Sequence, residues 1–178
     1  MRVAYADPPY PGCAHLYKDH PDYAGEVDHA ELIDRMEREF PDGWALSTSA
    51  AALPLVLGLC PKVQTASELR VCAWVRSVVP RPPARIMWSW EPLIVRTTNW
   101  RQRREGDFVR DVLTGAGQPS GFLGGKITGQ KPPGFCHWMF HLLGLSPDDD
   151  FVDLFPGSGA VGQEWNAWRN QLGIEAWA

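Results

Sequence analysis

The chain has 178 residues, of which 44% are hydrophobic and 21% are charged, and its formal net charge is −4 at pH 7. A chain of this length buries about 70% of the surface that it exposes when unfolded, so we expect one domain over residues 1–178. Because no run of about 20 apolar residues occurs, we expect no membrane span. The four scattered cysteines favour a reducing cytoplasm, and a strand predicted at the N-terminus leaves no room for a signal peptide.

The first predicted element is a strand over Met1–Ala6, which leads directly into Asp7-Pro8-Pro9-Tyr10. The prolines fix the turn and donate no N–H, so the Asp7 carboxylate and the Pro8 carbonyl can accept both hydrogens of an exocyclic amine. Two such acceptors would localise a lone pair that a nucleobase ring otherwise withdraws, and Tyr10 could stack on the base. A rigid Pro-Pro turn with chance neighbours is the alternative for this motif taken alone.

Helices and strands alternate through the middle of the chain. Asp28 with Glu31 three residues later is typical of a capping box, which predicts a helix that ends near Glu39. Alternating strands and helices predict an α/β fold with a mostly parallel sheet and helices on both faces. The further elements that we expect are strands over Trp44–Ser49, Leu69–Val78 and Ile86–Thr97, and helices over Ala50–Leu59 and Pro132–Leu143.

The strand expected over Ile86–Thr97 has two unusual features. Glu91-Pro92 predicts a bulge or a position at the edge of the sheet, because proline cannot donate to a strand ladder. Trp88 and Trp90 alternate on one face, which favours packing in the core over stacking on a base.

Positive charge is concentrated in residues 70–110. Nine arginines face three acidic residues there, so this segment carries about +6 and the remainder about −10. Arginine pairs with phosphate and tryptophan stacks on bases, so we interpret residues 97–129 as a flexible loop that binds nucleic acid, with a short helix near Asp107–Leu113. A solvated arginine-rich loop is the alternative. The candidate contacts are Arg96, Trp100, Arg101, Arg103, Arg104 and Arg110.

A strand beginning at Phe151 runs into Pro156-Gly157-Ser158-Gly159 and then into a helix predicted over Gly162–Asn170. Glycines permit a tight turn and close approach of a ligand, and a helix N-terminus offers free N–H groups. No Gly-Lys-Ser/Thr follows, which excludes a P-loop, and we expect no dinucleotide-binding unit. Ligands of parallel sheets bind at the carboxyl ends of the strands, so Asp7 and Gly157 are expected to meet in one cleft.

Together, Asp7–Tyr10 and Asp153–Gly159 resemble the catalytic and cofactor motifs of S-adenosylmethionine (SAM)-dependent amino-methyltransferases of nucleic acids. The order of the two motifs resembles the permuted β group of this family. That group includes bacterial and phage DNA adenine methylases and the relatives of the enzyme that makes N6-methyladenosine in messenger RNA. Tyr23–Asp28 resembles a loop that shapes the base pocket, and Lys131-Pro132 resembles a motif whose lysine lies near the cofactor carboxylate.

The resemblance implies a circularly permuted Rossmann-like methyltransferase fold that binds SAM and transfers its methyl group directly to the N6 amine of adenine, without a metal. It implies catalytic roles for Asp7, Pro8, Pro9 and Tyr10, and a nucleic-acid contact for Tyr23. The implied cofactor-binding residues are Ala6, Asp7, Lys131, Asp153, Phe155, Pro156, Gly157, Ser158 and Gly159, with either the pair Asn170 and Gln171 or Glu175 on the ribose.

The implied partner is nucleic acid, and no membrane is expected. Asp7 in place of serine disfavours cytosine-N4 enzymes, and Tyr10 in place of tryptophan favours the DNA adenine enzymes over the messenger-RNA branch. The resemblance points to a bacterial or phage-infected cytoplasm. It leaves open RNA adenosine, cytosine N4 or a free base as the acceptor, and also a homodimer, a complex with a partner subunit, or a non-catalytic nucleic-acid-binding subunit.

Overall fold

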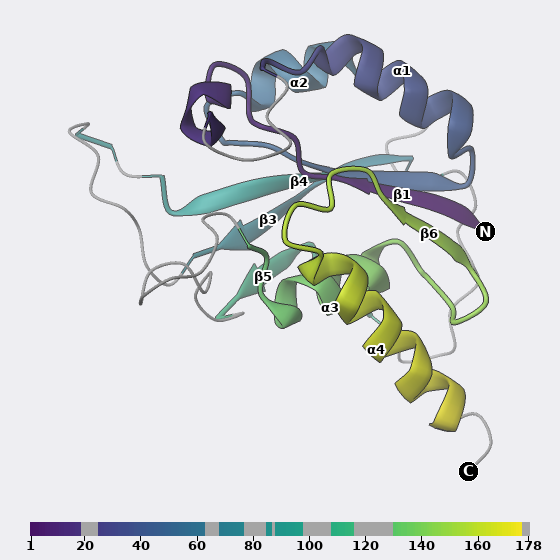
Figure 1. The fold of residues 1–178 in the computed structure, drawn as a ribbon. Coiled ribbons are helices and arrows are strands. Elements are labelled where there is room, and N and C mark those ends of the chain that lie inside the picture. Colours follow the sequence, from purple (N-terminus) through teal and green to yellow (C-terminus); the bar gives the residue numbers. More distant parts are fainter. Residues whose placement is uncertain are drawn as a thin grey trace.

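A computed structural model describes residues 1–18, 25–62, 68–76, 85–86, 88–97, 108–115 and 130–175 (Figure 1). Within these ranges the strands form one six-stranded sheet in the order β5-β3-β4-β2-β1-β6. The strands are β1 (Arg2–Ala6), β2 (Gly43–Ser47), β3 (Leu69–Val75), β4 (Trp90–Thr97), β5 (Val112–Thr114) and β6 (Asp150–Asp153). The helices are α1 (His29–Glu39), α2 (Leu53–Leu59), α3 (Pro133–Leu142) and α4 (Ala160–Glu175), with a short 3-10 helix η1 (Ala14–Tyr17).

Strand β4 alone among the described strands runs against its neighbours. It pairs antiparallel with β2 and β3, whereas β1 pairs parallel with β2 and β6, and β3 pairs parallel with β5. Helices α1 and α2 cover one face of the sheet and α3 and α4 cover the other (Figure 1). The predicted α/β architecture, with a mostly parallel sheet between helices, is confirmed.

The central strand β1 is buried on both faces, because its alternate side chains enter two different cores. Val3 and Tyr5 pack in the cluster that contains the aromatic residues of α3 and α4, whereas Ala4 and Ala6 pack in the cluster under α1 and α2. Such strands sit at the centre of α/β sheets, where both faces are covered by helices. The turn that follows β1 is therefore held by a rigid element.

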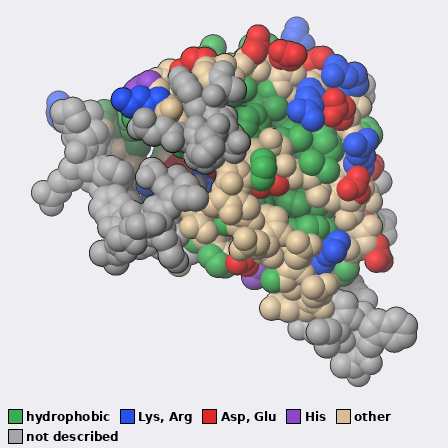
Figure 2. Space-filling view, in the orientation of Figure 1, with side chains coloured by type: hydrophobic (Ala, Val, Ile, Leu, Met, Phe, Trp, Pro, Cys, Tyr) green, Lys and Arg blue, Asp and Glu red, His purple; other side chains and the backbone are tan. Residues whose placement is uncertain are grey.

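Helix α1 begins as the sequence predicts. The Asp28 carboxylate accepts from the backbone N–H groups of Ala30 (2.9 Å) and Glu31 (3.1 Å), which satisfies donors that have no partner within the helix. The outward face of α1 carries acidic and basic side chains side by side (Figure 2), including the pair of Arg38 with Asp34 at 2.8 Å. Such pairs stabilise an exposed helix face weakly.

Two expectations for strands are wrong. A strand, β5, occupies Val112–Thr114 where we expected part of a short helix, because β3 offers an open edge and the β-branched Val112 and Thr114 suit a pleated surface. Strand β4 lies inside the sheet, not at its edge. Pro92 is tolerated there because its carbonyl accepts from Thr48 just past the end of β2, so the absent N–H falls where the β2 ladder has ended.

Trp88 and α4 also differ from expectation. The Trp88 side chain is 54% exposed and precedes β4, so it does not pack in the core with the strand. Helix α4 continues to Glu175, five residues beyond the predicted end. No helix in the described ranges combines the length and the apolar character that a bilayer crossing requires.

Candidate active site

The two sequence motifs meet at one edge of the sheet. Strands β1 and β6 are parallel neighbours in which Tyr5 is paired with Asp153, and the Leu154 N–H donates to the Tyr5 carbonyl at 2.9 Å. Asp7 lies two residues beyond Tyr5, and Gly157 lies four residues beyond Asp153. The two motifs, expected to meet in one cleft, therefore follow the carboxyl ends of neighbouring strands, although they are 150 residues apart in the chain.

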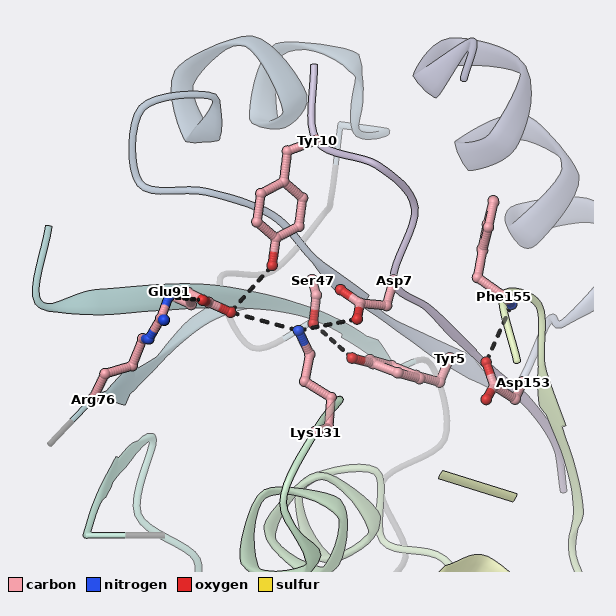
Figure 3. Close-up of polar contacts among 9 residues, drawn as sticks. All are labelled: Tyr5, Asp7, Tyr10, Ser47, Arg76, Glu91, Lys131, Asp153 and Phe155. Atoms are coloured by element: carbon pink, nitrogen blue, oxygen red, sulfur yellow. Dashed lines mark hydrogen bonds and ion pairs between the residues drawn. The ribbon is translucent and has the colours of Figure 1, made fainter. Parts of the chain in front are cut away.

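Asp7 forms an ion pair with Lys131, which lies just before α3. The Lys131 Nζ atom is 3.0 Å from Asp7 Oδ2 and 3.5 Å from Glu91 Oε2, and its side chain is only 6% exposed (Figure 3). Burial raises the pKa of Asp7, and the Lys131 ammonium opposes that rise without cancelling it. Burial disfavours the charge on Lys131, but Asp7 and the groups around it raise its pKa well above the usual value. The lysine therefore stays charged and favours an ionised Asp7.

Glu91, near the start of β4, joins this pair to Tyr10. Its Oε2 atom accepts from the Tyr10 hydroxyl at 3.1 Å, and its Oε1 atom pairs with the Arg76 guanidinium (Figure 3). Glu91 was not among the site residues expected from the sequence, where it was noted only as an acidic residue and, with Pro92, as a bulge or edge position. A signal was present, because a carboxylate next to Leu93-Ile94-Val95 in a buried strand needs partners.

A pair of hydroxyl groups, from Tyr5 and Ser47, lies beside the Lys131 ammonium. The Tyr5 hydroxyl and the Ser47 Oγ atom are 2.8 Å apart and buried, and both side chains come from strand ends at the ligand edge (Figure 3). Burial raises the pKa of Tyr5 and of Tyr10 well above the usual value, so both phenols are neutral donors. The site is therefore lined by fixed polar groups before any ligand binds.

The glycine-rich turn connects β6 to α4. Gly157 has φ 46° and Gly159 has φ 74°, backbone conformations that favour glycine, and the Gly159 N–H donates to the Pro156 carbonyl at 2.6 Å. Asp153 Oδ1 accepts from the Phe155 N–H at 3.2 Å. Asp153 Oδ2 is buried and has no hydrogen-bond partner within the described ranges. Burial raises the pKa of Asp153 to about 6, although the Phe155 N–H opposes the rise.

The free oxygen of Asp153 is the feature of this turn that most clearly fits a ligand. An unpaired buried acceptor costs free energy, which a ligand ammonium or hydroxyl would recover. Ala6 is fully buried behind the edge, Pro156 and Gly157 are exposed, and Ser158 is half-buried. Their contact with a cofactor stays a prediction.

The backbone positions of Asn170, Gln171 and Glu175 lie along α4. Asn170 and Gln171 are exposed on α4, which leaves the glycine turn and runs away from the ligand edge (Figure 1). At 1.5 Å per residue, Asn170 lies about 15 Å along the helix axis from Ala160, and Glu175 about 22 Å. Their role toward the cofactor ribose stays a prediction, and the described chain is helical through all three positions.

The predicted nucleic-acid contacts fall into three groups. Arg96 is 12% exposed and forms ion pairs with Glu37 (3.3 Å) and Glu68 (3.5 Å), so its guanidinium is engaged within the protein instead of being presented to phosphate. Arg110 is exposed, and its carbonyl accepts from the Trp138 indole at 2.8 Å. The remaining candidates lie outside the described residues: Tyr23, Trp100, Arg101, Arg103 and Arg104.

No protein-family model and no curated protein sequence matches the chain. Two solved structures of M1.HpyAVI do match. The M1.HpyAVI–SAM complex has 15% sequence identity and a TM-score of 0.56, and the match covers 95% of this chain and 78% of that chain. A second structure of M1.HpyAVI has 16% identity and a TM-score of 0.57, with 95% and 77% covered. The chain therefore has the fold of M1.HpyAVI, a protein whose complex with SAM has been solved.

Proposed function

We propose that the chain is a SAM-dependent methyltransferase that acts on the N6 amine of adenine in DNA. The observation that carries the proposal is the meeting of Asp7–Tyr10 and the glycine turn at the ends of the neighbouring strands β1 and β6. The resemblance of the two motifs to those of the permuted methylases supports SAM as the cofactor. The solved complex of M1.HpyAVI with SAM supports the same assignment. Ligand sites at the carboxyl ends of parallel strands are the rule for such sheets.

In the proposed reaction, the Asp7 carboxylate and the Pro8 carbonyl accept from the two N–H bonds of an adenine that has left its stack. Tyr10 stacks on the ring, and its hydroxyl bond to Glu91 fixes the plane of the phenol. The raised pKa of Asp7 makes its carboxylate a better acceptor for the proton that the amine loses on methylation. When bound, SAM would supply an electrophilic sulfonium methyl group. The contribution of the protein is to hold acceptor and donor sites at one edge.

We assign the cofactor to the turn after β6. The free Oδ2 atom of Asp153 is a suitable partner for the ammonium of an amino-acid moiety, and the exposed Gly157 allows close approach of the ligand to the backbone. Lys131, which the resemblance places near the cofactor carboxylate, is paired with Asp7 and Glu91. Residues 97–129, with Arg110 among them, are proposed to contact the DNA backbone.

The proposal is tested by incubating purified protein and methyl-labelled SAM with DNA, RNA and free nucleosides, followed by mass spectrometry of the nucleosides. We expect N6-methyladenine in DNA with the native chain and with Asp34→Asn, a matched control on the exposed face of α1. Methylation of RNA, or N4-methylcytosine in place of N6-methyladenine, would show that adenine in DNA is not the substrate. Cofactor binding without transfer to any acceptor would favour a non-catalytic subunit and overturn the proposal.

A further inference from the structure

Glu91 is linked to both Tyr10 and Asp7. It accepts a hydrogen bond from the Tyr10 hydroxyl, and it shares Lys131 with Asp7. We propose that Glu91 is a positioning residue that fixes the Tyr10 ring and, through Lys131, sets how strongly Asp7 is held by its counter-ion. This inference rests on the proposed function, because Asp7 and Tyr10 are its acceptor and its stacking platform.

The direction of β4 explains why a residue in that strand reaches the site. Strand β4 is antiparallel to β2, so its first residues lie at the carboxyl ends of the parallel strands, and Glu91 lies two residues before Leu93, which pairs with Ser47 at the end of β2. Its side chain is 16% exposed and directs one oxygen to Tyr10 and Lys131 and the other to Arg76 (Figure 3). Both oxygens are therefore held, and the carboxylate has little freedom to move.

Charge is balanced across this cluster. Asp7 and Glu91 are the anions and Lys131 and Arg76 are the cations, and Lys131 bridges the two carboxylates at 3.0 Å and 3.5 Å. The three N–H donors of the Lys131 ammonium are thereby divided between two carboxylates. Glu91 thus draws part of the ammonium away from Asp7 and leaves the Asp7 oxygens more available to an incoming amine.

The pKa of Asp7 depends on how Lys131 is shared between Asp7 and Glu91. The titratable and charged groups that act on Asp7 or are acted on by it are Lys131, Glu91, Tyr5, Tyr10, Tyr17 and Asp153, with Arg76 behind Glu91. Lys131 lowers the pKa of Asp7 and Glu91 raises it. Removal of the Glu91 charge should therefore lower the pKa of Asp7, and removal of the Lys131 charge should raise it.

The experiment compares the acidic limb of the kcat/KM profile in Glu91→Gln, Lys131→Met and Glu37→Gln, because that limb reports the essential base of the free enzyme. Glu37 is a matched control, since it also pairs with an arginine and accepts from an aromatic side chain, the Trp44 indole, at 2.7 Å. We expect the limb to move to lower pH in Glu91→Gln, to higher pH in Lys131→Met, and not at all in Glu37→Gln. We also expect kcat of Glu91→Gln to fall about tenfold, because Lys131 then competes fully with the amine for Asp7.

Tyr10→Phe separates the other arm of the inference. It keeps the ring and removes the hydroxyl bond to Glu91, so we expect KM for DNA to rise several-fold. Because the Tyr10 hydroxyl also lowers the pKa of Asp7, we expect the acidic limb to move to higher pH, opposite to its movement in Glu91→Gln. If Glu91→Gln does not fold, Arg76→Gln tests the coupling from the other side: with this cation absent, Glu91 competes more strongly for Lys131 and the limb moves to higher pH. The inference is overturned if the acidic limb does not move in Glu91→Gln or, where that variant does not fold, in Arg76→Gln. It is also overturned if the limb of Glu91→Gln moves to higher pH, as that of Lys131→Met does.

A carboxyl ¹³C NMR titration keeps the inference distinct from the proposed function. It follows the pKa of Asp7 without turnover, and Asp7→Asn assigns the resonance. If the native chain transfers no methyl group, the proposed function fails. If the native chain is active but the Asp7 titration of Glu91→Gln coincides with that of Glu37→Gln, the inference about Glu91 fails alone.

Discussion

The two ends of β4 carry charged clusters of almost the same chemistry and of different consequence. Near its start, Glu91 pairs with Arg76 and Lys131 and accepts from the Tyr10 hydroxyl. Near its end, Arg96 pairs with Glu37 and Glu68, and Glu37 accepts from the Trp44 indole. Partnered charges with an aromatic donor therefore do not identify a functional site by themselves.

The position in the sheet separates the two clusters. Five residues of strand place the backbones of Glu91 and Arg96 about 17 Å apart, and the odd spacing turns their side chains to opposite faces. Of the two ends, the Glu91 end lies at the edge of the sheet that also holds the carboxyl ends of β2, β1 and β6, where ligands of such sheets bind. The Arg96 end anchors α1 to the sheet through Glu37. We therefore expect a functional effect from changes at one end and a stability effect from changes at the other.

The largest effect is expected at Asp7. Asp7→Asn keeps the shape of the side chain but removes the negative charge that polarises the amine, so methyl transfer should fall by about 10²–10³-fold while SAM affinity changes little. Initial rates with labelled SAM and equilibrium dialysis measure the two quantities. Turnover within a few-fold of the native rate would remove Asp7 from the reaction.

Arg96→Leu should have the opposite profile. It leaves Glu37 and Glu68 without their shared cation in a partly buried position, so we expect the free energy of unfolding to drop by about 2 kcal/mol in urea titrations. KM for DNA should not change, because the guanidinium is engaged within the protein. A large increase in KM with native stability would contradict the assignment and restore Arg96 as a phosphate contact.

The ionised Asp153 carboxylate should lower the free energy of unfolding of the ligand-free protein. Its pKa is raised to about 6 from an ordinary value of 3.8, so the native state binds the proton more tightly and loses stability as pH rises through this interval. Asp153→Asn should therefore be more stable than the native chain by about 2 kcal/mol above pH 6 and equal to it near pH 4. Melting temperatures across this range give the difference.

The same variant should bind the cofactor less well. The charge that destabilises the empty protein is the one proposed for the ligand ammonium, so we expect Asp153→Asn to weaken SAM binding about tenfold or more. A variant that gains stability and keeps its affinity would place the ammonium elsewhere.

The smallest effect is expected in the turn after β6. A Cβ at Gly159 would meet only the Gln163 side chain, at 3.8 Å, so Gly159→Ala has space but a strained φ of 74°, and we expect a loss of about 1 kcal/mol. Gly162→Ala is the matched control, because Gly162 lies within α4 without a positive φ or a close neighbour. Alanine there should raise stability by up to about 1 kcal/mol. Equal effects of the two changes would contradict the strain at Gly159.

Local sequence signals predicted the helices and strands well, but they predicted poorly which strands are neighbours and how far the last helix extends. The capping residue Asp28, the apolar strand before Asp7 and the glycines after β6 act within a few residues of themselves, and all three were placed correctly. Glu91-Pro92 predicted a bulge or an edge because proline loses a ladder bond, but the end of β2 removes that cost inside the sheet. The extent of α4 was not predicted, because the helix continues to Glu175, beyond the end expected at Asn170.

The sequence by itself determined the alternation of strands and helices and the two motifs at strand ends, since both depend on short-range periodicity and on residues with restricted backbones. Only the tertiary structure decided that Glu91 contacts Tyr10 and Lys131 and that Arg96 pairs with Glu37 and Glu68. That choice depends on the antiparallel direction of β4 and on its position between β3 and β2. Strand pairing is settled by long-range packing of the whole sheet, and no local pattern in the chain encodes which partner a charged side chain will meet.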